Sequence, residues 1–120
     1  MRLFSWNCKG FGKPSAVLQC RKKALDYKPD ILFLMETKLA RNKGKEIWMQ
    51  CGFSKGVEVP RVGLSGGLLL MWLPNVNLRV IHATPNFIHA DLVDNKGSPF
   101  SITFIYGYPN LPKEERFGSN

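Results

Sequence analysis

Two polar residues stand directly after apolar segments, where a fold can hold a metal ion or a phosphate. Glu36 follows the apolar run of residues 31–35, and a carboxylate is a ligand that hard divalent cations prefer. Asn7 closes the first apolar stretch, and its amide can both donate and accept a hydrogen bond. Taken alone, such a glutamate is also typical of a solvated strand end, and an asparagine before glycines is typical of a turn. The chemistry therefore depends on whether the fold brings the two residues together.

The hydrophobic pattern places both residues at strand ends. Residues 1–7 are predicted to form a strand, and residues 31–35 form a second strand that is buried on both faces. Residues 15–27 predict a helix, whose apolar side chains gather on and beside one face: Val17, Leu18, Cys20, Ala24 and Leu25. If this helix joins two neighbouring strands, they run in parallel and end at the same edge of the sheet, where ligands bind in such units. Asn7 and Glu36 are then neighbours.

The remaining sequence is dominated by strands. It predicts a short helix over residues 46–51 and strands over residues 52–59, 68–72, 77–84, 87–93 and 100–106. A last helix is predicted to begin at Pro112 and to end at Phe117. A β-α-β unit followed by antiparallel strands indicates an α+β fold with a large sheet or a sandwich. The last helix is too short to bury a face, so we expect the C-terminal part of the domain to lie outside this chain.

Basic residues are concentrated in the first half of the chain. Residues 1–61 hold 13 Lys and Arg and 5 acids, a net charge of +8, whereas residues 62–120 hold 4 of each kind, a net charge of 0. A one-sided basic charge is typical of proteins that bind a polyanion through its phosphates, while solubility would be served equally by an even distribution. The candidates for phosphate contact are Lys9, Lys13, Arg41, Lys43 and Lys45.

Length and cysteine content limit the class of protein. A chain of 120 residues has room for one domain. Its three cysteines, Cys8, Cys20 and Cys51, are odd in number and widely spaced, which indicates neither a disulfide framework nor a structural zinc site. The apolar runs are too short to span a bilayer, and no secretory signal peptide is visible. We therefore expect an intracellular protein without a membrane partner, and the nucleus is a possible location.

Four further residues have side chains of a kind that can take part in catalysis. His82 and His89 have no acid at the spacing of a catalytic dyad, so we expect exposed or hydrogen-bonded strand residues and not a general base. Ser65, in the sequence GLSGG, lacks both the preceding strand and the partner base of a nucleophile elbow. Tyr106 ends the last strand, where its phenol could bind a phosphate or pack as a half-buried aromatic before a turn.

Four motifs, in this order, resemble the endonuclease/exonuclease/phosphatase superfamily. They are SWNCKGFG at residues 5–12, KPDILFLMETK at residues 28–38, GLSGGLLLMW at residues 63–72 and IYGYPN at residues 105–110. The resemblance is greatest to the endonuclease domain of LINE-type (non-LTR) retrotransposons of plants, and it covers residues 2–117.

The resemblance implies a four-layer α/β/β/α sandwich that hydrolyses phosphodiesters with Mg²⁺ or Mn²⁺. It implies that Asn7 belongs to the active site, that Glu36 binds the metal and that Lys38 supports the site. A tyrosine of the family contacts the phosphate. Tyr106 matches it best, and Tyr108 is the alternative because this motif carries one extra residue before its proline.

The resemblance also implies that part of the active site is missing. The family's second half supplies an Asp/Asn pair and a terminal Asp-His pair, and residues 1–120 hold no counterpart of either. We therefore expect the N-terminal part of a single domain: a partial sandwich without its C-terminal half, derived from a DNA endonuclease and inactive by itself. Three alternatives stay open, namely a basic nucleic-acid-binding module without catalysis, a fragment of a phosphatase of the same superfamily, and a decayed remnant without a stable fold.

Overall fold

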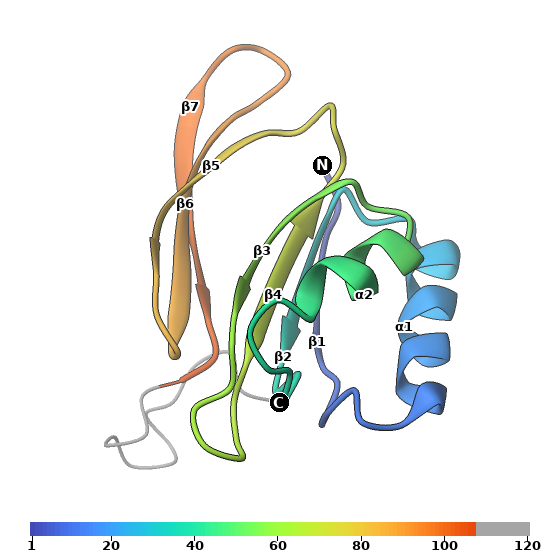
Figure 1. The fold of residues 1–120 in the computed structure, drawn as a ribbon. Helices are drawn as coiled ribbons and strands as arrows, with labels where there is room; N and C mark the ends of the chain where they lie inside the picture. The colour runs from blue at the N-terminus through green and yellow to red at the C-terminus, as the bar shows by residue number, and fades with distance from the viewer. Residues whose placement is uncertain (108–120) are drawn as a thin grey trace.

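The computed structural model describes residues 1–107, so the predicted helix at residues 112–117 and the alternative Tyr108 lie outside the described part of the chain. In chain order the elements are β1 (Leu3–Asn7), α1 (Pro14–Tyr27), β2 (Ile31–Met35), α2 (Gly44–Gln50), β3 (Lys55–Val59), β4 (Leu68–Trp72), β5 (Asn77–Ala83), β6 (Phe87–Val93) and β7 (Pro99–Ile105) (Figure 1). Within the described residues, neither helix has the length and apolar composition needed to cross a membrane.

The first sheet is built around two strands that are buried on both faces. Its strand order is β1-β2-β4-β3. β1 and β2 pair in parallel, with Asn7 opposite Met35 at their ends, whereas β4 is antiparallel to β2 and to β3. Every residue of β2 and β4 is buried, which explains why their sequences are continuous apolar runs rather than alternating ones. The parallel pairing of the first two strands, predicted from the sequence, is confirmed.

The second sheet is an antiparallel meander in which only one face is apolar. Its strand order is β5-β6-β7. In the central strand β6, Ile88, Ala90 and Leu92 are buried, while the intervening His89 and Asp91 are only partly buried. This alternation, with a period of two residues, is typical of a sheet that packs one face against a core.

The elements form three layers: the two helices, the first sheet and the second sheet (Figure 1). Buried apolar residues fill the space between the sheets: Ile31, Phe33, Met35, Leu68, Leu70, Trp72, Val76, Ile88, Ala90, Leu92 and Phe104. A second core separates the first sheet from the helices: Cys8, Phe11, Cys20, Leu32, Leu34, Ile47, Cys51, Phe53, Leu69 and Met71. Because β2 contributes to both cores, the residue that follows it, Glu36, leaves a strand that is fixed from both sides.

The helix α1 covers less of the sheet than its sequence suggested. Cys20 is fully buried, but Leu18 and Leu25 are 59% and 72% exposed. The prediction that these two leucines lie beside the buried face is wrong, because at about 3.6 residues per turn they project beyond the narrow stripe that contacts the sheet.

The short helix α2 begins at Gly44, two residues before the predicted start. The carboxylate of Glu58, on β3, accepts hydrogen bonds from the backbone N–H of Asn42 (2.6 Å) and of Gly44 (2.9 Å). A negative group at a helix N-terminus satisfies N–H groups that have no partner within the helix. This contact spans 14 residues of sequence between Gly44 and Glu58, so no local pattern around residue 44 could indicate it.

Candidate metal and phosphate site

The ends of β1 and β2 and the loops that follow them lie against one another. The backbone N–H of Cys8 donates to the carbonyl of Met35 (3.0 Å), and the N–H of Phe11 donates to the carbonyl of Thr37 (3.0 Å). The loop after Asn7 is thereby joined to the segment that carries Glu36. This arrangement agrees with the expectation that both polar residues emerge at one edge of the sheet.

Glu36 is contacted by a residue of the second sheet. The hydroxyl of Tyr106 donates a hydrogen bond to Oε1 of Glu36 at 2.9 Å. Tyr106 directly follows β7, and its backbone N–H is bound to the carbonyl of Asn86 (2.8 Å). Since Glu36 follows β2 in the first sheet, the pair joins the ends of the two sheets. The structure therefore brings together two of the residues that the sequence analysis had selected.

The backbone around Glu36 turns sharply. Glu36 and Lys38 both have a φ of 54°, a left-handed conformation that costs side-chain-bearing residues free energy and persists only where the surroundings enforce it. Here the intervening Thr37 is buried, at 1% exposure. The N–H groups of Thr37 and Lys38 donate to the carbonyls of Gly67 (3.1 Å) and Gly66 (2.8 Å). The turn is therefore fixed by the loop before β4.

Gly67 is the residue whose role the sequence analysis missed. It has a φ of +95°, and a Cβ placed on it would lie against Oγ1 of Thr37 and 3.0 Å from the backbone nitrogen of Lys38. A side chain at this position would separate the two segments. From the sequence, GLSGG is considered only as a possible nucleophile elbow and as the start of a family motif. Two consecutive glycines directly before a fully buried strand are the signal that could have indicated close backbone approach.

Asn7 and Lys38 occupy the rim of this region. Oδ1 of Asn7 accepts a hydrogen bond from the backbone N–H of Lys9 at 3.1 Å, the local turn contact expected of an asparagine at a strand end. The side chain of Lys38 is exposed, and its aliphatic part lies over Gly10, where an added Cβ would be 3.3 Å from Cδ of Lys38. The glycine loop after β1 thus supports Lys38 through contact with its aliphatic carbons.

Cys8 lies directly behind the candidate metal ligand. Its Sγ donates to the carbonyl of Met35 at 3.2 Å and lies 3.6 Å from the carbonyl of Glu36. Burial raises the pKa of the Cys8 thiol to about 11, because a thiolate is poorly solvated in an apolar core. Cys8 is therefore a neutral thiol that anchors the end of β2, and it is not a nucleophile.

The donor atoms of Glu36 suit a hard divalent cation. Mg²⁺ is commonly held by one or two carboxylates, several waters and the oxygens of a substrate phosphate, without a complete protein cage. Glu36 supplies one carboxylate, and its orientation is set by the hydroxyl of Tyr106. Among residues 1–107 no three His, Cys, Asp or Glu side chains converge as a metal-binding group. The residues present fit the open type of magnesium site rather than a closed structural one.

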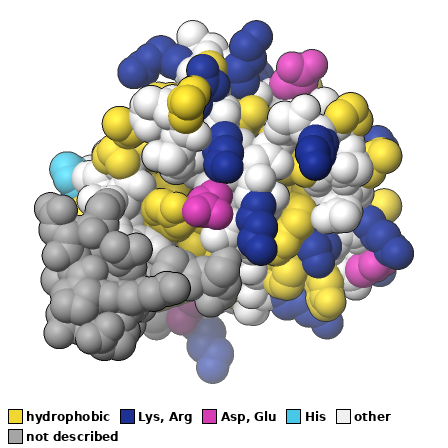
Figure 2. Space-filling model, turned by 90° about the horizontal axis from the view of Figure 1, so that it is seen from below, with side chains coloured by type: hydrophobic (Ala, Val, Ile, Leu, Met, Phe, Trp, Pro, Cys, Tyr) yellow, Lys and Arg dark blue, Asp and Glu magenta, His cyan; other side chains and the backbone are white. Residues whose placement is uncertain are grey.

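Basic side chains surround this end of the sandwich. The candidates for phosphate contact are all exposed: Lys9, Lys13, Arg41, Lys43 and Lys45. Figure 2 views the molecule from the end at which β1 and β2 finish, and it shows Lys and Arg scattered between uncharged and apolar side chains. Arg41 and Lys43 precede α2 and Lys45 lies in its first turn, and this segment is held by the hydrogen bonds from Asn42 and Gly44 to Glu58. The basic side chains of this segment therefore project from a backbone that is held in place.

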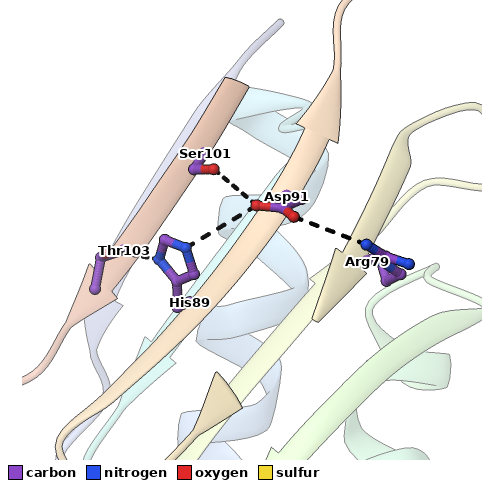
Figure 3. Close-up of polar contacts among 5 residues, drawn as sticks. All are labelled: Arg79, His89, Asp91, Ser101 and Thr103. Atoms are coloured by element: carbon purple, nitrogen blue, oxygen red, sulfur yellow. Dashed lines mark hydrogen bonds and ion pairs between the residues drawn. The ribbon is translucent and has the colours of Figure 1, made fainter. Parts of the chain in front are cut away.

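The two histidines lie away from this site. His82 is exposed, and Nδ1 of His89 is hydrogen-bonded to Oγ1 of Thr103 (2.8 Å), as expected of strand residues. No acid was expected at the spacing of a catalytic dyad, yet Nε2 of His89 lies 4.0 Å from Oδ1 of Asp91, two residues along the same face of β6 (Figure 3). Asp91 also accepts a bond from Ser101 (2.7 Å). The core between the sheets separates this polar group from Glu36.

Solved structures with a similar fold include three enzymes. The catalytic domain of human Nocturnin has a TM-score of 0.61 at 17% identity, with 92% of this chain and 51% of that chain covered. The AP endonuclease LMAP from Leishmania major has a TM-score of 0.62 at 20% identity, with coverages of 88% and 40%. The 3'-5' exonuclease NExo from Neisseria meningitidis has a TM-score of 0.58 at 18% identity, with coverages of 89% and 41%. No protein-family model and no curated protein matches the sequence.

These similarities define the class of fold. The neighbours are proteins of the endonuclease/exonuclease/phosphatase type, and the described residues have the α+β arrangement of part of that fold. The fold expected from the sequence motifs is therefore confirmed at this level. The chain spans between 40% and 51% of the length of these solved structures.

Proposed function

We propose that this chain forms part of a divalent-metal-dependent phosphodiesterase, with Glu36 as a ligand of Mg²⁺ or Mn²⁺. The observation that carries the proposal is the 2.9 Å hydrogen bond from Tyr106 to Glu36. It fixes a carboxylate at the sheet edge where Asn7 also ends its strand. A carboxylate held in this way loses little conformational freedom when it binds a cation.

Each residue of the site has a proposed task. A bound divalent cation would supply Lewis acidity to a phosphate oxygen. The single hydroxyl proton of Tyr106 orients Glu36, and it would turn to a phosphate oxygen when a substrate is bound. Asn7 would place its amide at the other side of the phosphate, and the ammonium group of Lys38 would offset negative charge. Asn7 and Tyr106 are the proposed catalytic residues, and Lys38 is a supporting one.

The proposed substrate is DNA, and the proposed origin is a LINE-type retrotransposon endonuclease. The support is the net charge of +8 in residues 1–61, the exposure of the basic side chains near the strand ends and the order of the sequence motifs. An AP endonuclease and a structure bound to a product DNA hairpin are also among the proteins with a similar fold. DNA binding of this kind is driven by phosphate contacts and is independent of sequence.

The metal assignment is tested by titrating the 120-residue chain with Mn²⁺ and following binding by electron paramagnetic resonance. Glu36→Gln keeps the shape of the side chain and removes its charge, so we expect the dissociation constant to rise at least about 10-fold. Asp91→Asn is the matched control, since Asp91 lies on the outer face of the second sheet, and it is expected to bind as the unchanged protein does. Equal affinities for the unchanged chain and the Glu36 variant would contradict the proposal.

A plasmid-nicking assay with Mg²⁺ tests catalysis by the chain itself. Loss of one charge-stabilising group typically slows an enzyme by about 10²–10³-fold, and the resemblance places several such groups outside residues 1–120. We therefore expect no nicking above background. Nicking that depends on Glu36 would show that residues 1–120 are sufficient, and it would reverse the expectation of inactivity while supporting the metal role.

Binding of nucleic acid without cleavage is the second candidate function. The exposed basic residues near the strand ends favour it over a phosphatase role. Fluorescence anisotropy with duplex DNA distinguishes a binding module without catalysis from a metal-dependent phosphodiesterase site. Binding that weakens steeply with salt and is unaffected by Glu36→Gln or by removal of divalent metal supports a binding module, whereas binding strengthened by Mn²⁺ only when Glu36 is present supports the phosphodiesterase site.

A further inference from the structure

All three cysteines of the chain are buried in the core between the helices and the first sheet. Two of them are in contact, because Sγ of Cys20, on α1, lies 3.2 Å from Sγ of Cys51, the residue that follows α2. Cys20 is fully buried, and Cys51 is 9% exposed. Buried thiols often serve only as small apolar side chains, but that role does not require two sulfur atoms to meet.

We propose that Cys20 and Cys51 form a redox-sensitive pair that closes reversibly into a disulfide linking α1 to α2. The sulfur atoms must approach from 3.2 Å to the disulfide bond length of about 2.05 Å. This is a movement of roughly 1 Å, which small rotations of the two side chains can supply. The pairing is not indicated by the sequence, in which 31 residues separate the two cysteines.

The oxidant in the proposed reaction is a peroxide. Cys51 reacts first, since it retains some exposure whereas Cys20 has none, and its hydrogen bond with Cys20 lowers the pKa of the Cys51 thiol. The Cys51 thiolate attacks one peroxide oxygen, the O–O bond breaks, and a sulfenic acid and water form. The Cys20 sulfur then attacks the Cys51 sulfur, expelling a second water. Two thiols and one hydrogen peroxide therefore give one disulfide and two water molecules.

The bond would change the layer that covers the first sheet. In the structure, α1 and α2 are held to the sheet by packing of apolar side chains. A disulfide would join them covalently and would restrict the unfolded chain by closing a loop of about 30 residues. The oxidised chain should therefore melt at a higher temperature than the reduced chain, by about 10 °C for a domain of this size.

Random oxidation would give a different pairing. In an unfolded chain the probability of contact falls with loop length, so Cys8 and Cys20, 12 residues apart, would pair more often than Cys20 and Cys51. Selective formation of the longer loop is thus a consequence of the folded arrangement. It distinguishes a preformed pair from unspecific oxidation of a chain with three thiols.

The experiment compares the 120-residue chain after treatment with dithiothreitol or with hydrogen peroxide. After peroxide treatment we expect one reactive thiol on denaturation instead of three, and a loss of two mass units. Peptide mapping without reduction should give a single cross-link between the peptides that contain Cys20 and Cys51. The cross-link and the higher melting temperature should both disappear on addition of dithiothreitol.

Cys8→Ala is the matched control, because it removes the third thiol and leaves the proposed pair intact, so the cross-link should persist. Cys51→Ala should abolish both the cross-link and the redox-dependent melting temperature. The mapping is made on the unchanged protein, so the result does not depend on whether a variant folds. A dominant Cys8–Cys20 cross-link, dimers joined through cysteines, or three unreacted thiols after oxidation would each overturn the proposal.

Discussion

The hydroxyl of Tyr106 lies 2.9 Å from Oε1 of Glu36, although 70 residues separate them in the sequence. Glu36 follows β2 and Tyr106 follows β7, so the contact exists only when the two sheets are stacked. The inter-sheet core, in which Phe33 and Phe104 lie with ring centroids 5.4 Å apart, therefore positions the candidate metal ligand. Metal affinity and the packing of the sandwich should be coupled.

Removing the Tyr106 hydroxyl should weaken metal binding without unfolding the chain. In Tyr106→Phe the ring keeps its place, but Glu36 loses the donor that orients it, and loss of such a partner typically costs about 10-fold in metal affinity. Mn²⁺ titration measures the change. Tyr27→Phe is the control with the same chemical change, because Tyr27 ends α1 and stacks on Phe4. A Tyr106 variant that binds Mn²⁺ as tightly as the control would contradict the orienting role.

A methyl group at Gly67 should be strongly destabilising. Gly67→Ala would place Cβ against Thr37 and the backbone of Lys38, in addition to the strain of alanine at a φ of +95°. We expect the free energy of unfolding to fall by roughly 3 kcal/mol or more in urea denaturation. Gly97→Ala carries the strain at a φ of +82° with no atom within 4 Å of the added Cβ, so it should cost only about 1 kcal/mol. Equal losses would show that the contact with Thr37 is unimportant.

The Cys8 thiol should make the fold less stable at alkaline pH. Burial raises its pKa from 9.0 to about 11, so between these values the folded chain keeps a proton that the unfolded chain loses. This contribution to stability is complete below pH 9 and is lost as the pH rises to about 11, which amounts to about 3 kcal/mol in all. Urea denaturation from pH 8 to pH 11 should show a shallower decline for Cys8→Ala than for the unchanged chain. Parallel pH profiles would argue against a buried, neutral Cys8.

The basic residues at the start of α2 should contribute to DNA binding in proportion to their charge. Each phosphate contact adds about 0.9 to the slope of log affinity against log salt concentration. The double substitution Lys43→Ala and Lys45→Ala should therefore reduce that slope by about 2 if both lysines bind phosphate. Arg79→Ala and Lys96→Ala, on β5 and the β6–β7 turn of the second sheet, are the matched controls. A slope that changes equally in both double variants would indicate a diffuse electrostatic effect without a defined site.

Local patterns were sufficient for the parts of the site that depend on strand ends. A helix is predicted between the first strand and the apolar run that ends before Glu36. A helical crossover is the usual connection between parallel strands, so the sequence predicted that this run pairs in parallel with β1. The same rules placed Asn7 at the shared edge, and the register of Asn7 opposite Met35 agrees. The position of Tyr106 at a strand end left phosphate binding and packing as a half-buried aromatic equally open, and only the resemblance favoured a role in the site.

Contacts between distant loops could not be predicted. The glycines before β4 could have indicated a close backbone approach, but the bonds to them from Thr37 and Lys38 join backbone atoms, so the sequence does not identify the partner segment. The meeting of Cys20 and Cys51 depends on how α1 and α2 lie on the sheet. The two-residue period of β6 places Asp91 on the same face as His89, a neighbour that the spacing of a catalytic dyad does not indicate.

The alternation of buried and outward residues in β6 also fixes the register of β7, and with it the position of Tyr106 relative to Glu36. A shift of β7 by one residue against β6 would turn the buried Phe104 away from the core and bring Thr103 toward it. A shift by two residues keeps the faces correct but moves the end of β7 by about 7 Å, which is more than twice the present distance between Tyr106 and Glu36. Single-residue insertions within β7 should therefore separate Tyr106 from Glu36. Insertions in the β6–β7 turn leave the register of β7, and so the distance between Tyr106 and Glu36, unchanged.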